Sequence, residues 1–223
     1  MRVDVRGVIV PNDYKEWYDF WNVDCTCPRD IQDAVNSLPD DEDLDVYINS
    51  PGGEIASGSE IYTILRNCDR VKIHITGQAH SAASIIAMAG WSEMAPTALM
   101  MVHCVSTYGG GNHIDFEHTA EVLRAADEAL CTAYTGKTGM TKEEALAMME
   151  HETWMTAERA REKGLVDAIM FEEEESAPMA AASGIFKLPT KDQMNQLYKQ
   201  KMKTNRDIQL AQMKLDLLNL TRR

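Results

Sequence analysis

Strand-like and helical patterns alternate along most of this chain, and this alternation constrains the fold more than any other feature. Short apolar runs typical of strands lie at residues 6–10, 44–48, 71–76, 99–102 and 166–170. Apolar residues recur at helical spacing over residues 30–38, 55–68, 82–90, 115–138, 141–149 and 156–163. Strands and helices that alternate in this way build right-handed βαβ units around a largely parallel sheet. The sequence therefore predicts an α/β domain over residues 1–171.

The pattern breaks after this domain. Residues 172–189 are acidic and rich in Ala, Ser and Pro, which is typical of a linker. In residues 190–223, Leu210, Met213, Leu217 and Leu220 repeat at spacings of three and four and form one apolar helix face. Residues 187–223 carry nine Lys or Arg and three Asp, a net charge of +6, which leaves −19 on residues 1–186. We expect a C-terminal helical extension that is basic and amphipathic.

Composition excludes several classes of protein. The 223 residues are 44% hydrophobic, enough for a real core. No apolar run approaches the roughly 20 residues of a membrane span, and the first residues lack the apolar core of a signal peptide. The acidic body argues against a nucleic-acid partner, because phosphate contacts require a basic face. Cys25 and Cys27 are too close for the usual zinc spacing, and no second pair exists. We expect a cytoplasmic protein with reduced thiols and neither metal nor cofactor.

Ser81 has a position that suits a nucleophile. It lies in the segment 77–84, between the strand-like run 71–76 and a helix of small residues. The first turn of a helix has unpaired N–H groups and a dipole that favours negative charge, as acyl-transfer chemistry requires. The alternative is an ordinary N-cap serine. Ser84 is a rival nucleophile, but its position further into the helix predicts packing rather than exposure.

Three further features accompany this serine. The turn of residues 49–53 contains Gly52 and Gly53, and glycines let backbone N–H groups approach a ligand closely; a plain tight turn is the alternative. His103 follows the strand-like run 99–102, where sites in parallel sheets are assembled, and could act as a general base or as a structural histidine. Glu152 precedes the last helical pattern and is either the residue that orients His103 or part of a solvated acidic cluster.

Four sequence blocks, taken in order, closely resemble the Clp-type serine peptidases over residues 5–170. The blocks are YINSPGG at residues 47–53, GQAHS at 77–81, MVH at 101–103, and TWMTA at 153–157 with GLVD at 164–167. The resemblance implies a core of repeated ββα and βαβ units in a superhelical arrangement, an architecture shared with crotonase-type enzymes. It also implies a serine-type endopeptidase.

The resemblance assigns a role to each motif residue. It implies Ser81 as the nucleophile, His103 as the base, and the backbone N–H groups of Gly53 and Ala82 as the oxyanion hole. The family's third catalytic residue is an aspartate, and its position here is Glu152, one methylene longer.

The same glycine segment is expected to bind the substrate. Gly52, Glu54 and Ile55 are expected to bind substrate, with the segment 54–56 pairing with substrate backbone as an added strand.

Residues 81–90 and 152–156 look most similar to the phage and prophage branch, whose members resemble head-maturation proteases that cleave capsid or scaffold protein. Relatives form rings, so we expect a homo-oligomer with the helix at 115–138 as the protomer contact. An ATPase partner is doubtful, because this branch is not obviously built for one. The small residues 176–184 also suggest self-cleavage that would release the basic tail.

Other classes remain open at this point. A crotonase-type acyl-thioester enzyme would need no serine nucleophile. A capsid scaffold with a catalytically impaired peptidase fold would tolerate the departure at Glu152. Membrane-associated signal-peptide peptidases use a lysine base and usually carry a membrane segment, so His103 and the N-terminus argue against them.

Overall fold

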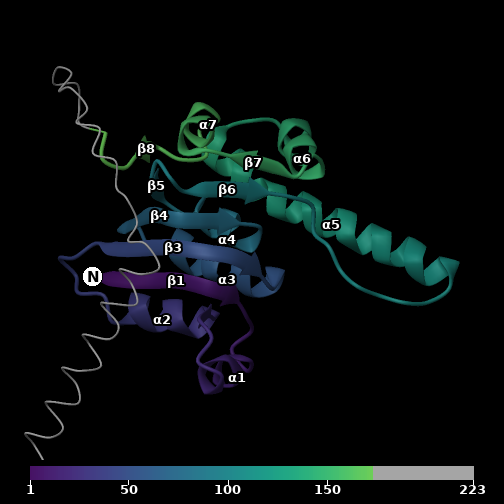
Figure 1. Cartoon of the computed structure of the whole chain (residues 1–223), viewed down its shortest axis with the longest axis horizontal. Coiled ribbons are helices and arrows are strands. Elements are labelled where there is room, and N and C mark those ends of the chain that lie inside the picture. The colour runs from purple at the N-terminus through teal and green to yellow at the C-terminus, as the bar shows by residue number, and fades with distance from the viewer. Residues whose placement is uncertain (173–223) are drawn as a thin grey trace, which may run out of the picture. The chain divides into compact units, whose positions relative to one another are not determined.

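The strands form one eight-stranded sheet in the computed structural model, which describes residues 1–172 (Figure 1). The expectations for the linker beyond residue 172 and for the basic tail lie outside the described residues. The strands are β1 (Arg2–Ile9), β2 (Cys25–Thr26), β3 (Leu44–Gly53), β4 (Val71–His80), β5 (Trp91–Met94), β6 (Leu99–Val102), β7 (Thr153–Met155) and β8 (Ala168–Ile169). The helices are α1 (Lys15–Phe20), α2 (Pro28–Asn36), α3 (Ile55–Arg66), α4 (Ala82–Ile86), α5 (His113–Thr138), α6 (Lys142–Glu150) and α7 (Ala157–Glu162).

The sheet is parallel except where β7 runs antiparallel to β6, which confirms the predicted α/β class. Its main path is β2-β1-β3-β4-β5-β8. On one side, β4 pairs with β5 over residues 72–75 and then with β6 over residues 78–80. Because β4 and β6 are parallel, the residues that follow them emerge at the same edge of the sheet. This edge carries the candidate site.

Alternation along the strands separates a buried face from a polar one. Val46, Ile48 and Ile73 are fully buried, and α3 and α4 lie over this face (Figure 1). The neighbouring positions carry polar side chains, as expected for strands with one solvated face. There, the Nε2 and Nδ1 atoms of His74 lie 2.9 Å from Asp45 Oδ1 and 2.6 Å from Glu93 Oε1.

Several elements differ from the sequence-based expectation. Neither α1 nor β2 was predicted. Tyr14, Trp17 and Trp21 are spaced by three and four residues in and beside α1, but this helix has only six residues and none of them is buried. The short strands β5 and β7 also escaped notice, because so few residues carry too little pattern. The predicted helix 82–90 is too long: α4 ends at Ile86. The expected glycine turn at 49–53, whether a ligand-binding turn or a plain tight turn, does not form. Pairing of Val8 with Gly52 and of Ile9 with Gly53 keeps this segment extended as the end of β3.

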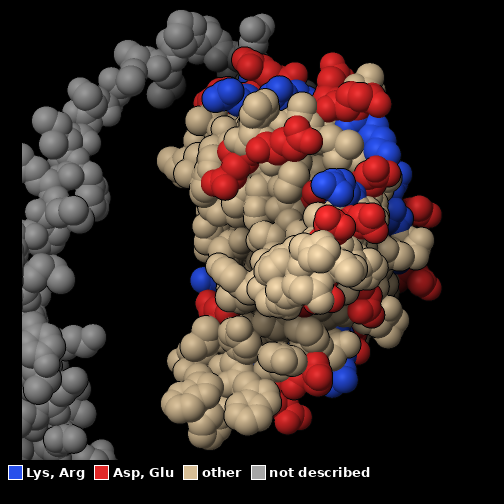
Figure 2. All heavy atoms as spheres, turned by 90° about the vertical axis from the view of Figure 1, so that its right-hand side faces the viewer, with Lys and Arg blue, Asp and Glu red and all other residues tan. Residues whose placement is uncertain are grey.

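Helix α5 extends beyond the sheet, towards the right of Figure 1. Its buried residues, Cys131, Ala133 and Tyr134, all lie in its last third. Ile114 and Phe116, near its start, are 62% and 54% exposed. Figure 2 views this end of the molecule and shows uncharged side chains gathered between acidic ones. The first half of α5 therefore presents apolar side chains that the described residues of its own chain do not cover.

Among residues 1–172, none of the helices combines the length and the apolar character that a bilayer-spanning segment needs.

Candidate active site

The parallel pairing of β4 and β6 brings Ser81 and His103 together. His80 is in register with Met101, and the N–H of Ser81 donates to the carbonyl oxygen of Met101 at 2.9 Å. The side chains then meet, with Ser81 Oγ 2.8 Å from His103 Nε2. Both residues are partly exposed at the surface. A serine hydroxyl bonded to an imidazole can transfer its proton to the ring when the oxygen attacks an electrophile.

Ser81 adopts a strained backbone conformation. Its φ of 53° and ψ of −126° lie outside the regions that residues with a side chain favour. Strain of this kind persists where the surrounding structure enforces it, commonly at functional sites. Ser81 precedes α4 but makes no side-chain capping hydrogen bond. The ordinary N-cap alternative therefore does not describe this serine, whose hydroxyl bonds to His103 instead.

The two glycines at the end of β3 allow close packing, Gly52 against Ser81 and Gly53 against Ile9 of β1. Gly52 has a φ of 92°, and a Cβ there would lie 2.6 Å from the His80 carbonyl oxygen and 2.7 Å from Ser81 Cβ. A Cβ on Gly53, whose φ is 155°, would lie 2.1 Å from the carbonyl oxygen of Ile9. Only glycine fits at either position.

A small pocket of about 60 Å³ collects most of the predicted site residues. Gly53, Ile55, Ser81, Ala82 and His103 all line it. Residues that the sequence did not single out complete the wall: Ile85, Val105, Ser106, Leu130, Tyr134 and Met149. The fold therefore brings the glycine segment, Ser81 and His103 together around one pocket.

Glu54, which was predicted to bind substrate, makes its side-chain hydrogen bonds within its own helix. Its carboxylate caps α3 and accepts hydrogen bonds from the N–H groups of Ala56 at 2.9 Å and Ser57 at 2.6 Å. Burial raises the pKa of Glu54, but these hydrogen bonds outweigh burial and hold the pKa below its ordinary value. The residue lines a separate cavity with Pro11 and Asn12.

Glu152 lies in the turn between α6 and β7, with a φ of 45° and an exposed side chain. Its carboxylate accepts a hydrogen bond from the indole Nε1 of Trp154 at 3.2 Å. Within residues 1–172, His103 has a side-chain hydrogen bond to Ser81 and none to a carboxylate. The turn is nevertheless close to the residue after His103, because the N–H groups of Cys104 and Glu152 both donate to the Met149 carbonyl oxygen. The role of Glu152 as orienting residue stays a prediction.

Two residues near the site, Asp127 and Cys104, belong to none of the sequence motifs. Asp127 on α5 accepts the N–H of Val105 at 2.6 Å and so anchors the segment that follows His103. Burial, followed by the negative charge of Asp127, raises the pKa of the Cys104 thiol to about 11. This thiol stays protonated at neutral pH and does not compete as a nucleophile. The sequence did contain a pattern that could have indicated Asp127. Asp127, Leu130 and Tyr134 lie at steps of three and four and so share one helix face.

Ser84 is fully buried at 0% exposure, which excludes it as the rival nucleophile in this conformation. Its hydroxyl contacts the Ser81 carbonyl oxygen and the Tyr134 hydroxyl.

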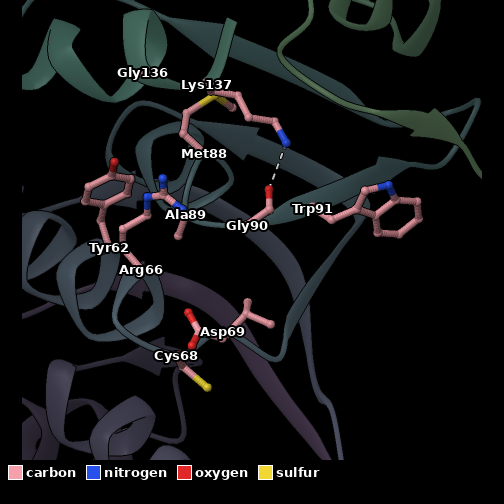
Figure 3. Close-up of a pocket in the computed structure, with 11 residues that line it drawn as sticks. Tyr62, Arg66, Cys68, Asp69, Met88, Ala89, Gly90, Trp91, Gly136 and Lys137 are labelled. Carbon is pink, nitrogen blue, oxygen red and sulfur yellow. Dashed lines mark hydrogen bonds between the residues drawn. The ribbon is translucent and has the colours of Figure 1, made fainter.

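A larger cavity of about 340 Å³ lies apart from Ser81 and shares no lining residue with its pocket (Figure 3). Tyr62 and Arg66 of α3 border it together with Lys137 of α5, whose Nζ donates to the Gly90 carbonyl oxygen at 2.8 Å. It contains no serine or histidine, so the chemistry is assigned to the smaller pocket. Among residues 1–172, His, Cys, Asp and Glu side chains form no group of three that could hold a metal ion.

Comparison with known proteins agrees with this geometry. The chain is 29% identical over 140 residues to the ATP-dependent Clp protease proteolytic subunits of two strains of Bacteroides fragilis. Each alignment covers 61% of this chain and 68% or 64% of the relative. The sequence profile described as Clp protease matches residues 32–173, which include Gly53, Ser81, His103 and Glu152. Because this match covers more than half of the chain, the chain belongs to the Clp protease family.

Proposed function

We propose that this protein is a serine endopeptidase of the Clp type, which hydrolyses peptide bonds through an acyl-enzyme on Ser81. The observation that carries the proposal is the 2.8 Å contact between Ser81 Oγ and His103 Nε2, at a serine held in a strained conformation beside the pocket. Membership of the Clp protease family supports it independently.

The mechanism follows from the positions of these groups. His103 Nε2 accepts the hydroxyl proton as Ser81 Oγ attacks the scissile carbonyl carbon. The N–H groups of Gly53 and Ala82 are proposed to hold the oxyanion. The imidazolium of His103 then protonates the leaving amine, which leaves an acyl-enzyme. Water, deprotonated by the same imidazole, attacks the acyl carbon and releases the second product.

We infer that Glu152 orients the imidazole through its Nδ1 atom. The family has an aspartate at this place, and the turn that carries Glu152 lies beside Cys104. The Trp154 indole bonds to Oε1 of this carboxylate, and its second oxygen is the one proposed to accept from Nδ1. Glu152→Gln and Glu152→Asp test the role. An orienting carboxylate predicts a large loss of turnover for the amide and retained activity for the aspartate. Equal activity of wild type and Glu152→Gln would instead leave a working Ser81–His103 pair.

We infer a homo-oligomer in which α5 contacts a second copy. The apolar side chains on its projecting half, Ile114 and Phe116 among them, support this. Size-exclusion chromatography with light scattering should show a complex well above the 25.0 kDa of one chain. A monomer would remove this part of the proposal.

The substrate is proposed to be a phage capsid or scaffold protein, on the resemblance of residues 81–90 and 152–156 to the head-maturation branch. Co-expression with neighbouring capsid genes, with wild type or Ser81→Ala, tests this when the products are read by mass spectrometry. Identical products from both would exclude these substrates. The same samples test release of the tail at residues 176–184.

A fluorophosphonate probe tests the chemistry directly. The probe should label wild-type protein at Ser81, and Ser81→Ala should abolish labelling. His103→Ala should slow labelling by a factor of at least about 100, as loss of a positioned general base does. Ser92→Ala is a matched control, because this buried serine lies on β5 and lines none of the three cavities described above. Peptide hydrolysis without any label on Ser81 would contradict the acyl-enzyme mechanism. A crotonase-type enzyme would neither hydrolyse peptides nor be labelled at Ser81.

A further inference from the structure

A buried set of hydrogen bonds links α5 to the backbone of Ser81. The Ser84 hydroxyl donates to the Ser81 carbonyl oxygen at 2.7 Å, and the Tyr134 hydroxyl lies 2.8 Å from Ser84 Oγ. The backbone N–H of Ser84 donates to the same carbonyl oxygen at 2.9 Å. Ser84 and Tyr134 are 0% and 1% exposed.

The directions of these hydrogen bonds follow from the atoms involved. A carbonyl oxygen only accepts, so the single proton of the Ser84 hydroxyl points at Ser81. The Tyr134 hydroxyl must then donate to Ser84 Oγ. Burial raises the pKa of the Tyr134 phenol, which keeps this proton in place. Each polar group here is removed from water, so loss of one partner leaves another unpaired at a real cost.

The Ser81 carbonyl oxygen belongs to the residue whose backbone is strained. At a φ of 53° and a ψ of −126°, the peptide group after Ser81 would relax unless other groups held it. Two donors from Ser84 converge on this carbonyl oxygen, and Tyr134 orients one of them. These bonds act on the ψ angle of Ser81 and thereby on the direction of its Oγ.

We propose that Ser84 and Tyr134 are positioning residues that hold the Ser81 backbone in the conformation that directs its hydroxyl at His103. This inference rests on the proposed peptidase function. Helix α5 supports the histidine as well, because its Asp127 holds the N–H of Val105, two residues after His103. Helix α5 therefore holds the segments of both reacting residues, and its packing position sets the distance between Ser81 Oγ and His103 Nε2.

Tyr134→Phe and Ser84→Ala test the inference in the full chain. The first keeps the ring and removes one hydroxyl, and Ser92→Ala again serves as the control. The variants are compared by the limiting rate constant of fluorophosphonate labelling, the half-saturating probe concentration, and the thermal midpoint. The limiting rate constant should fall about three- to tenfold, the range of one lost hydrogen bond, with half-saturation unchanged. The control should match wild type.

The double variant separates a network from two independent effects. If both hydroxyls act through one chain of bonds, Tyr134→Phe should have little further effect once Ser84 is alanine. A labelling rate of Tyr134→Phe equal to that of wild type would overturn the inference, and so would a loss fully explained by a lower thermal midpoint. Absence of labelling in wild type would instead overturn the proposed function.

Discussion

Gly52→Ala tests whether the end of β3 fixes the position of the nucleophile. The new Cβ would lie 2.6 Å from the His80 carbonyl oxygen, 2.7 Å from Ser81 Cβ and 3.1 Å from the Ala82 nitrogen. Carbon atoms in contact are normally about 3.5–4.0 Å apart, so Ser81 or β3 must move by more than about half an ångström. All these atoms belong to the backbone or to Cβ, and none can rotate away.

The cost has two parts. Alanine at a φ of 92° is strained by about 1–3 kcal/mol, and overpacking of a closely packed site adds about 1–3 kcal/mol. We expect the free energy of unfolding to fall by about 2–6 kcal/mol. A shift of the same size lengthens the distance from Oγ to His103 Nε2, 2.8 Å in the native fold, to more than about 3.3 Å, beyond the usual length of this hydrogen bond. Labelling of folded Gly52→Ala should therefore slow by about 100-fold.

Urea unfolding followed by tryptophan fluorescence measures the first effect, and fluorophosphonate labelling without urea measures the second. Gly136→Ala is the control: its Cβ would meet nothing within 4 Å. It lies inside α5, where alanine should stabilise the fold by about 0.5–1 kcal/mol. If Gly52→Ala lost less than about 1 kcal/mol and labelled at nearly the wild-type rate, the reasoning about close packing would be refuted.

Three further predictions concern capping and pKa. Glu54→Ala should lower the free energy of unfolding by about 1 kcal/mol at pH 7, since two capping bonds are lost. The folded pKa of Glu54 lies below its ordinary 4.5, so its contribution is complete above that pH and disappears as the pH falls through the folded pKa; urea titrations of both proteins at several pH values should show the gap closing there. Thr141→Ala removes the cap in which Thr141 Oγ1 accepts the Glu144 N–H at 3.1 Å and should cost about 0.5–1 kcal/mol in the same assay; an unchanged urea midpoint would count against this cap. Iodoacetamide at pH 8 should alkylate native Cys104 at least about tenfold more slowly than the unfolded chain, because the pKa is raised from 9.0 to about 11; equal rates in mass spectrometry would contradict the raised pKa.

Much of the fold was predictable because its pattern is local. Alternating burial in β3 and β4 and helical spacing in α3 and α5 can be read over a few residues, and the two hydrogen bonds of the capping box at Thr141 join residues only three positions apart. Very short elements were missed. Helix α1 has six residues and buries none of them, and β7 has three residues that pair with β6.

The same division applies to the site. The sequence by itself determined that Ser81 and His103 follow parallel strands, and such strand ends share one edge of the sheet. Ala82 follows Ser81 directly, and only the resemblance to the Clp peptidases implied that Gly53 joins them. Only the tertiary structure decided what these residues contact across long separations. Tyr134 reaches Ser84 across 50 residues, and Asp127 reaches Val105 across 22. It also turned the carboxylate of Glu54 towards its own helix and that of Glu152 towards Trp154. Side-chain direction depends on packed neighbours, which no local periodicity encodes.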